Sequence, residues 1–377
     1  MPSSLLLAPR REAGRADLLE RRLRRFHPRC QGAVRALAMR HARIADLAVS
    51  FPALLFALAV PRPGLDPARA LACVIDGRPL AEVAAVAGVP MWLRKLPPEA
   101  FCGPIPNLPD GDLFRRQIAN HLPRSPKLAP AWLQVVAEAA ELAHAPAAIW
   151  IAREFVRAAP PRVNPVRLRL IALWSWFSVQ PATFGCDMIN KPWTPDMRMD
   201  QAVDAADDWR MIIALHLNLG RQPIADMWLA PGQVAGYDFV PLSSTAAIIA
   251  EAAAMKNCLR TYGYNLAHNR SRLWSVRRDG ARVATLKVAC AFRDPLPMIV
   301  ELRGPGNADV PRELSWAARK WLHMHDLSQI DMSQRKWGTA PLDRILWRSL
   351  WRPYWLARRR IPVWLPIGPS RAALDAL

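Results

Sequence analysis

The dipeptide Asp279-Gly280 constrains the fold more than any other feature of this sequence, because it separates two alternating, β-rich segments. These segments are residues 272–277 and residues 282–289. Asp-Gly readily adopts the positive φ angles of the tight turns that join antiparallel strands. A third β-rich segment, residues 298–302, follows them. The sequence therefore predicts a three-stranded antiparallel meander.

Helices are predicted on both sides of the meander. Residues 243–245 are Ser-Ser-Thr, which are good N-caps for a helix over 246–255. A second helix is predicted from about residue 311 to residue 325. Helix, meander and helix together form a small α+β module.

The rest of the chain shows helical patterns, so the predicted fold class is α+β with a mostly helical N-terminal region. Leu80 to Val89 resembles the first half of a helix-turn-helix, but Pro97-Pro98 stops the next helix early, which favours an ordinary helical hairpin. Four segments are predicted: a basic helical segment at 1–66, an all-helical region at 67–240, the α+β module at 241–330 and a helical Trp/Arg-rich tail at 331–377.

The charge of the chain predicts an anionic partner. Lys and Arg number 51 against 31 Asp and Glu, which gives a formal net charge of +20. Such a field attracts polyanions, and arginine binds phosphate in a bidentate manner. Nucleic acid is therefore a candidate partner, with a protein partner as the alternative, although a GC-rich genome would also favour arginine codons.

The cysteines argue against a metal centre. The six cysteines form no CxxC pair, and His323 and His325 diverge by about 200° on a helix, so neither a metal nor a cofactor is expected. Without a secretory leader or a disulfide framework, the expected compartment is the cytoplasm. The longest apolar run, Leu47 to Val60, is shorter than the roughly 20 residues of a membrane span and predicts a buried helix instead.

The C-terminal tail interleaves tryptophan and arginine at helical spacing. Trp347, Trp351 and Trp355 recur every four residues, and Arg344, Arg348 and Arg352 lie beside them. Such a stripe suits packing against the protein, stacking on nucleic-acid bases or a membrane interface. These six residues are the candidate nucleic-acid-binding residues.

Two short motifs flank the predicted hairpin. Met255-Lys-Asn-Cys258-Leu259 with Tyr262 precedes it, and Glu301-Leu-Arg303-Gly304-Pro-Gly-Asn307 ends its third strand. Over about residues 245–325 this arrangement resembles the PcfJ-like protein family, which is named after a protein of a conjugative plasmid and is widespread in bacteria and their mobile elements. The family often has His before the Cys and Gln before the second motif, where this chain has Asn257 and Glu301.

The resemblance implies a shared functional surface but no reaction. Its candidate residues are Asn257, Cys258, Tyr262, Arg277, Glu301, Arg303, Gly304 and Asn307. Cys258 and His268 could form a thiol nucleophile and its base, but the apolar neighbours of Cys258 favour a buried structural cysteine. The Arg303-Gly304 turn could hold a phosphate, or an internal Arg–Glu pair could simply fix the turn.

Three functions fit these patterns. The leading hypothesis is an accessory protein, PcfJ-like and linked to mobile elements, that contacts nucleic acid. An alternative is an enzyme that acts on a small anionic or nucleotide substrate at the Cys258, Arg303 and Asn307 surface. A protein-interaction module that uses the Trp-rich tail is the third. The sequence does not decide whether the chain is an enzyme.

Overall fold

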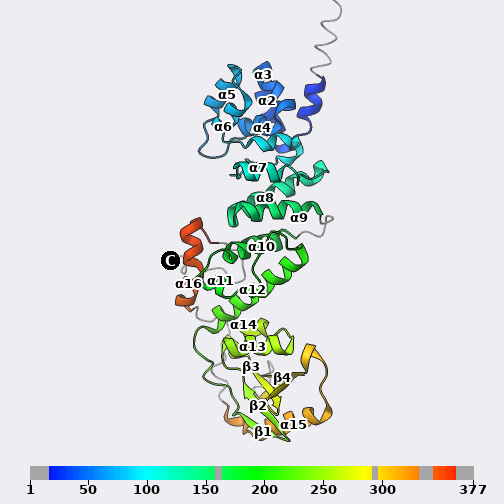
Figure 1. Ribbon diagram of the computed structural model, residues 1–377, viewed down its shortest axis with the longest axis vertical. Coiled ribbons are helices and arrows are strands. Elements are labelled where there is room, and N and C mark those ends of the chain that lie inside the picture. The colour runs from blue at the N-terminus through cyan, green and yellow to red at the C-terminus, as the bar shows by residue number, and fades with distance from the viewer. Residues whose placement is uncertain (1–16, 158–163, 291–295, 331–342, 362–377) are drawn as a thin grey trace, which may run out of the picture. The chain divides into compact units, whose positions relative to one another are not determined.

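The computed structural model of the chain describes residues 17–157, 164–290, 296–330 and 343–361. The chain divides into two compact units (Figure 1). The first holds the described residues up to Val179 together with Pro192–Val203, and the second holds Gln180–Lys191 and the described residues from Asp204 on. The predicted boundary near residue 66 lies inside the first unit, and those near residues 240 and 330 lie inside the second.

The first unit is helical, as predicted. Its helices begin with residues 17–23 and continue with α2 (Pro28–Ala38), α3 (Ala42–Ser50), α4 (Pro52–Ala59), α5 (Pro67–Ile75), α6 (Leu80–Val86), η1 (Met91–Lys95), η2 (Pro98–Ala100), α7 (Asp112–Ile118), η3 (Pro126–Leu128), α8 (Ala129–Leu142), α9 (Ala145–Arg157) and α10 (Pro165–Ser178). The apolar run predicted as one buried helix is two, because the backbone turns at Phe51 and Pro52 begins α4. Among the described residues, no helix is both long and apolar enough to cross a membrane.

The helix-turn-helix pattern ends as a helical hairpin. Helices α5 and α6 contact each other, and the chain then turns at Gly88, whose φ is 60°. The next element, η1, is a 3-10 helix of 5 residues, too short for a recognition helix. The second helix of a helix-turn-helix is therefore not formed after α6, and the hairpin in the structure is the one between α5 and α6.

The second unit combines helices with one antiparallel sheet. Its elements are α11 (Phe184–Asp187), the part of α12 (Met199–Leu219) from Asp204 on, β1 (Gly232–Val234), β2 (Tyr237–Pro241), α13 (Thr245–Met255), η4 (Leu259–Tyr262), α14 (Gly263–Ala267), β3 (Ser271–Arg278), β4 (Ala281–Cys290), β5 (Pro297–Arg303), η5 (Pro305–Asn307), α15 (Arg312–His323), η6 (Leu327–Gln329) and α16 (Arg344–Arg358). The α+β class is confirmed.

The sheet has five strands in the order β1-β2-β3-β4-β5, so the predicted number of three is wrong. Strands β1 and β2 lie in a region predicted to be all helical. They are short, and they join at Ala235 and Gly236, both with positive φ. Their pairing depends on β3, where Phe239 lies opposite Val276. Because β3 lies more than 30 residues further along the chain, the local sequence of β1 and β2 does not indicate this pairing.

The predicted hairpin is confirmed. Strands β3 and β4 pair on either side of Asp279 and Gly280, whose φ angles are 51° and 78°. Two consecutive positive φ angles match the right-handed twist of the strands. Strand β5 then pairs antiparallel with β4 and completes the predicted meander.

Helices cover the two faces of the sheet. On one face, Trp274 and Leu286 belong to a core with Trp321 of α15. On the other, Leu273 packs with Ile248 of α13 and Leu259 of η4. Alternate residues of each strand therefore face different helices, and the polar alternates of β4 and β5 face the side of α13.

Candidate functional site

A small cleft in the second unit brings together most of the motif residues; we call it the polar cleft. It encloses about 20 Å³ and is lined by Asn257, Cys258, Leu259, Tyr262, Thr285, Lys287, Glu301, Arg303 and Asn307. A single water needs roughly 10–15 Å³ of such space, so the cleft accepts about one water or the tip of one polar group. Four segments contribute: the end of α13 with η4, strand β4, strand β5 and η5.

The end of α13 places Cys258 at the cleft. Ser244 caps the start of this helix, and Lys256 ends it in a left-handed conformation with φ of 50°. This turn directs Met255 and Leu259 into the core, where they are 1% and 5% exposed, and leaves Cys258 exposed. The expectation of a buried structural cysteine is therefore wrong, because helical spacing does not continue through the left-handed residue.

The register of β4 and β5 places the charged groups. Lys287 lies opposite Glu301, and Thr285 lies opposite Arg303. The ammonium group of Lys287 donates to Glu301 Oε1 over 3.0 Å. Arg303 instead pairs with Asp309. The internal Arg–Glu pair was one of two alternatives for this turn; the structure instead has a Lys–Glu pair in the cleft and an Arg–Asp pair across the loop.

The loop after β5 is a tight turn, as the sequence indicated. The N–H of Gly304 donates to the carbonyl oxygen of Ala308 over 2.8 Å. Gly306 and Asn307 have φ angles of 65° and 63°, so the glycine that the backbone requires is Gly306. Gly304 is extended, with φ of −76°, and does not line the cleft.

A hydrogen-bond network forms the back of the cleft. The fully buried carboxylate of Glu251 accepts from Arg282 Nε over 2.8 Å and from Thr285 Oγ1 over 3.3 Å. Asn257 donates its side-chain N–H to Thr285 Oγ1 over 3.2 Å. The network ties α13 to β4 and to the turn that carries Asn257. Sequence reasoning missed Glu251 of α13, whose partners lie on β4, and Lys287, whose role follows from the register of β4 with β5.

The surroundings fix the proton states of Tyr262 and Glu301. Burial, and the hydrogen bond of 2.8 Å that its hydroxyl donates to Glu301, raise the pKa of Tyr262 well above its ordinary value. Burial alone would raise the pKa of Glu301, but the donors Tyr262 and Lys287 lower it below its ordinary value. At neutral pH the cleft thus holds a protonated phenol and an ionised carboxylate.

The candidate residue Arg277, and His268, which was considered as a base for Cys258, lie elsewhere. His268 is 1% exposed, its Nδ1 lies 2.7 Å from the carbonyl oxygen of Tyr264, and it does not line the polar cleft. Arg277 also does not line the cleft; its Nε donates to Ser275 Oγ on β3. The Cys–His pair that the sequence left as the less favoured alternative is therefore not assembled.

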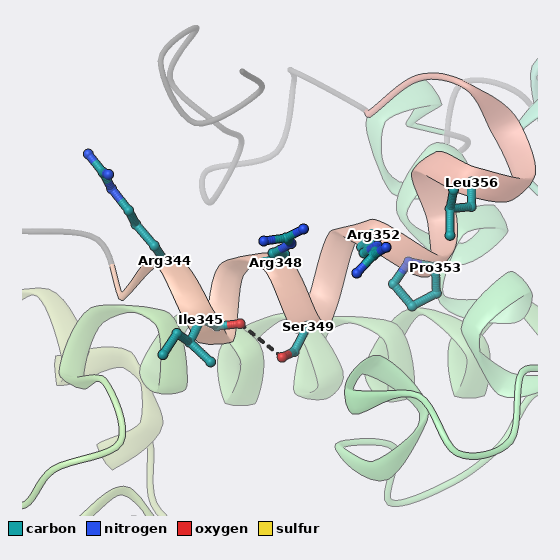
Figure 2. Close-up of a pocket in the computed structure, with 7 residues that line it drawn as sticks. All are labelled: Arg344, Ile345, Arg348, Ser349, Arg352, Pro353 and Leu356. Atoms are coloured by element: carbon teal, nitrogen blue, oxygen red, sulfur yellow. Dashed lines mark hydrogen bonds between the residues drawn. The ribbon is translucent and has the colours of Figure 1, made fainter. Parts of the chain in front are cut away.

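Helix α16 presents a second candidate surface, the arginine row, formed by Arg344, Arg348 and Arg352 (Figure 2). All three side chains are exposed and extend from the same side of the helix. The tryptophans differ: Trp347 and Trp351 are 1% and 0% exposed, and Trp355 is partly buried. The stripe therefore packs against the protein on its indole side and offers its guanidinium groups to solvent.

A metal centre is not evident in the described ranges, where no group of three or more His, Cys, Asp or Glu side chains could hold an ion. A scan against protein-family models finds no match to the chain, and searches of curated proteins and of solved structures find no similar protein. The resemblance of residues 245–325 to the PcfJ-like family stays a prediction.

Proposed function

We propose that this chain is an accessory protein that contacts the phosphates of nucleic acid through the arginine row. One observation carries the proposal: the row concentrates positive charge on an exposed helix face with no acidic side chain among the residues lining that face. Arginine provides bidentate hydrogen bonds to phosphate, and the net charge of +20 attracts polyanions to the whole chain.

The row lacks the acidic partners that other arginines of this unit have. Arg282 pairs with Glu251 and Arg221 with Asp343, whereas none of Arg344, Arg348 and Arg352 forms an ion pair with any described residue. Like charges four residues apart each destabilise a helix by about 0.2–0.5 kcal/mol. Arg344 also stands in the first turn, where the helix dipole disfavours a cation. An anionic partner would relieve both effects.

The resemblance to the PcfJ-like family adds a context to this proposal. Proteins of conjugative plasmids and other mobile elements act where nucleic acid is transferred or maintained. A basic chain with a phosphate-binding helix suits an accessory role in such a setting. The polar cleft then belongs to the α+β module that accompanies α16 in the second unit.

Salt-dependent binding tests the proposal. Fluorescence anisotropy with labelled DNA and RNA at several salt concentrations should show a steep loss of affinity with salt, because bound phosphates release counterions. Replacing Arg344, Arg348 and Arg352 with Gln should reduce the log–log salt slope by roughly 0.9 for each phosphate that the variant no longer neutralises.

A charge-matched variant provides the control. Arg40, Arg69 and Arg116 are exposed residues of the first unit without a described ion pair. Replacing all three with Gln removes the same charge and should leave the slope nearly unchanged. Absence of binding by the unmodified protein at low salt would overturn the proposal.

A second candidate function is an enzyme acting on a small anionic or nucleotide substrate at the polar cleft. The observation that favours it is the exposed thiol of Cys258 at the cleft, near the hydroxyl of Tyr262. Its difficulty is size, since a cleft of about 20 Å³ must open to admit a substrate. Calorimetric titration with nucleotides and with orthophosphate tests it: binding that Arg303→Ala abolishes would favour the enzyme.

A further inference from the structure

Among the described residues, the arginine row has no aromatic platform of the kind that single-strand binding surfaces use. We infer that α16 binds the phosphate backbone of a nucleic-acid duplex rather than the bases of a single strand. The inference rests on the proposed function, and it specifies which form of nucleic acid that function uses. Three features of the helix support it: the position of its aromatic rings, the small or aliphatic side chains between its arginines and the spacing of those arginines.

The aromatic rings of α16 point away from the row. Trp347, Trp351 and Tyr354 are between 0% and 1% exposed. Trp355 is partly buried, and its ring lies 5.0 Å from the guanidinium carbon of Arg359. Proteins that bind single strands stack successive bases on exposed aromatic side chains, with about 1–3 kcal/mol per base. No ring in the row is available for that interaction.

The side chains between the arginines are small or aliphatic. The hydroxyl of Ser349 donates to the carbonyl oxygen of Ile345 over 2.8 Å, as Figure 2 shows. Pro353 and Leu356 complete the lining of this face. These groups leave room for a phosphate ridge between the guanidinium groups, and the Ser349 hydroxyl already donates its proton within the helix.

One side of α16 is buried against its own unit. Leu346 and Leu350 pack inward with the aromatic residues, and α16 contacts α11 in the same unit. The opposite side is exposed and carries the arginine row. On this proposal the row contacts the phosphates of the duplex, which carry no direct sequence information.

The arginines also have a fixed spacing. Residues four positions apart on a helix are separated by about 6 Å along its axis. A helix holds this spacing rigidly, and a duplex presents a regular array with one charge per about 1.7 Å of its axis. A flexible single strand has a lower charge density and must be ordered to match a rigid row, which lowers its affinity.

Competition among four ligands tests the inference. We would measure fluorescence anisotropy with four labelled ligands of equal length: a DNA duplex, an RNA duplex, a DNA single strand and an RNA single strand. Both duplexes should bind about tenfold more tightly than either single strand, which corresponds to about 1.4 kcal/mol. Two duplexes of unrelated sequence should differ far less than the roughly 10³-fold or more of a specific site.

The outcomes separate the inference from the proposed function. Failure of all four ligands to bind would overturn the proposed function itself. Tighter binding to single strands would overturn only the duplex inference. Binding to just one of the two duplex types, or a strong preference among duplex sequences, would show that grooves are read and would also overturn it.

Two variants link the result to α16. Replacing Arg344, Arg348 and Arg352 with Gln should remove the preference for duplex. Ser349→Trp places a ring in the row without removing a charge and should raise single-strand affinity several-fold while duplex affinity changes little. Should the single-strand affinity of Ser349→Trp stay unchanged, the missing ring would not explain the preference, and the inference would fail.

Discussion

At Glu301, the neighbouring groups determine which proton form the carboxyl takes. Because the donors Tyr262 and Lys287 lower its pKa in the folded protein, the charged form contributes stability above the ordinary pKa of about 4.3. That contribution is lost as the pH falls through the lowered, folded-state pKa. The Glu301 side chain is 45% exposed, so the contribution should stay below about 1 kcal/mol.

The measurement is the melting temperature of the protein and of Glu301→Gln across roughly pH 3 to 7, which spans the ordinary carboxyl pKa. The unmodified protein should melt higher near neutral pH, and the two curves should converge at the acid end. A difference that persists at the lowest pH would mean that packing, and not the charge, carries the effect.

At Cys258, exposure replaces the burial that its apolar neighbours indicated. Iodoacetamide should therefore modify Cys258 in the native protein but spare Cys290, which is 8% exposed. Cys258→Ser should change stability by less than about 0.5 kcal/mol, as surface substitutions do. Cys290→Ser should cost roughly 1–3 kcal/mol by burying an imperfectly paired hydroxyl.

Peptide mass spectrometry after labelling and denaturant unfolding provide these measurements. Protection of Cys258 in the native protein, or a large loss of stability in Cys258→Ser, would restore the structural interpretation of this thiol. A change in nucleic-acid binding without a change in stability would instead connect the polar cleft to function.

Among the elements, the β3–β4 hairpin depends on its turn. Gly280 has φ of 78°, in a region that residues with a side chain rarely adopt. Gly280→Ala should therefore destabilise the protein by roughly 1–2 kcal/mol. Asp279→Asn is the matched control, because asparagine is also favoured at this turn position, and it should be neutral within about 0.5 kcal/mol. Denaturant unfolding of both variants checks the prediction, and equal stability would show that the strands alone fix the turn.

Helix α16 has one buried side and one exposed side. Its sequence places a tryptophan stripe and an arginine stripe side by side, and either could face the solvent. In the structure the indoles bury and the guanidinium groups stay exposed, because desolvating three unpaired charges would cost far more than burying the rings gains. The helix also continues past Pro353 to Arg358.

On the scale of the whole molecule, the net charge of +20 should act mainly on association rates. Long-range attraction depends on total charge, whereas the lifetime of a complex depends on local interactions. Replacing either set of three arginines with Gln should slow association to a similar, small extent. Only the set on α16 should speed dissociation. Stopped-flow measurements at low and moderate salt give the association and dissociation rates of both variants. Equal dissociation rates for the two variants would mean that the arginine row makes no specific interaction.

The described parts of the molecule also separate local from distant determinants. The sequence predicted α13, the β3–β4 hairpin, β5 and α15 close to their observed bounds, because N-caps, a tight turn and alternation act over a few neighbouring residues. It also indicated that the two motifs lie at one surface, and all but Arg277 and Gly304 of their candidate residues line the polar cleft.

Only the tertiary structure decided which strands and charged groups pair and whether Cys258 is buried. Strands β1 and β2 need β3 as a partner, and the Lys287–Glu301 pair needs the register of β4 with β5. Cys258 is exposed because a left-handed residue at Lys256 redirects the chain. Each of these outcomes rests on interactions between residues far apart in sequence or on a single backbone angle, and neither leaves a periodic signal in the sequence.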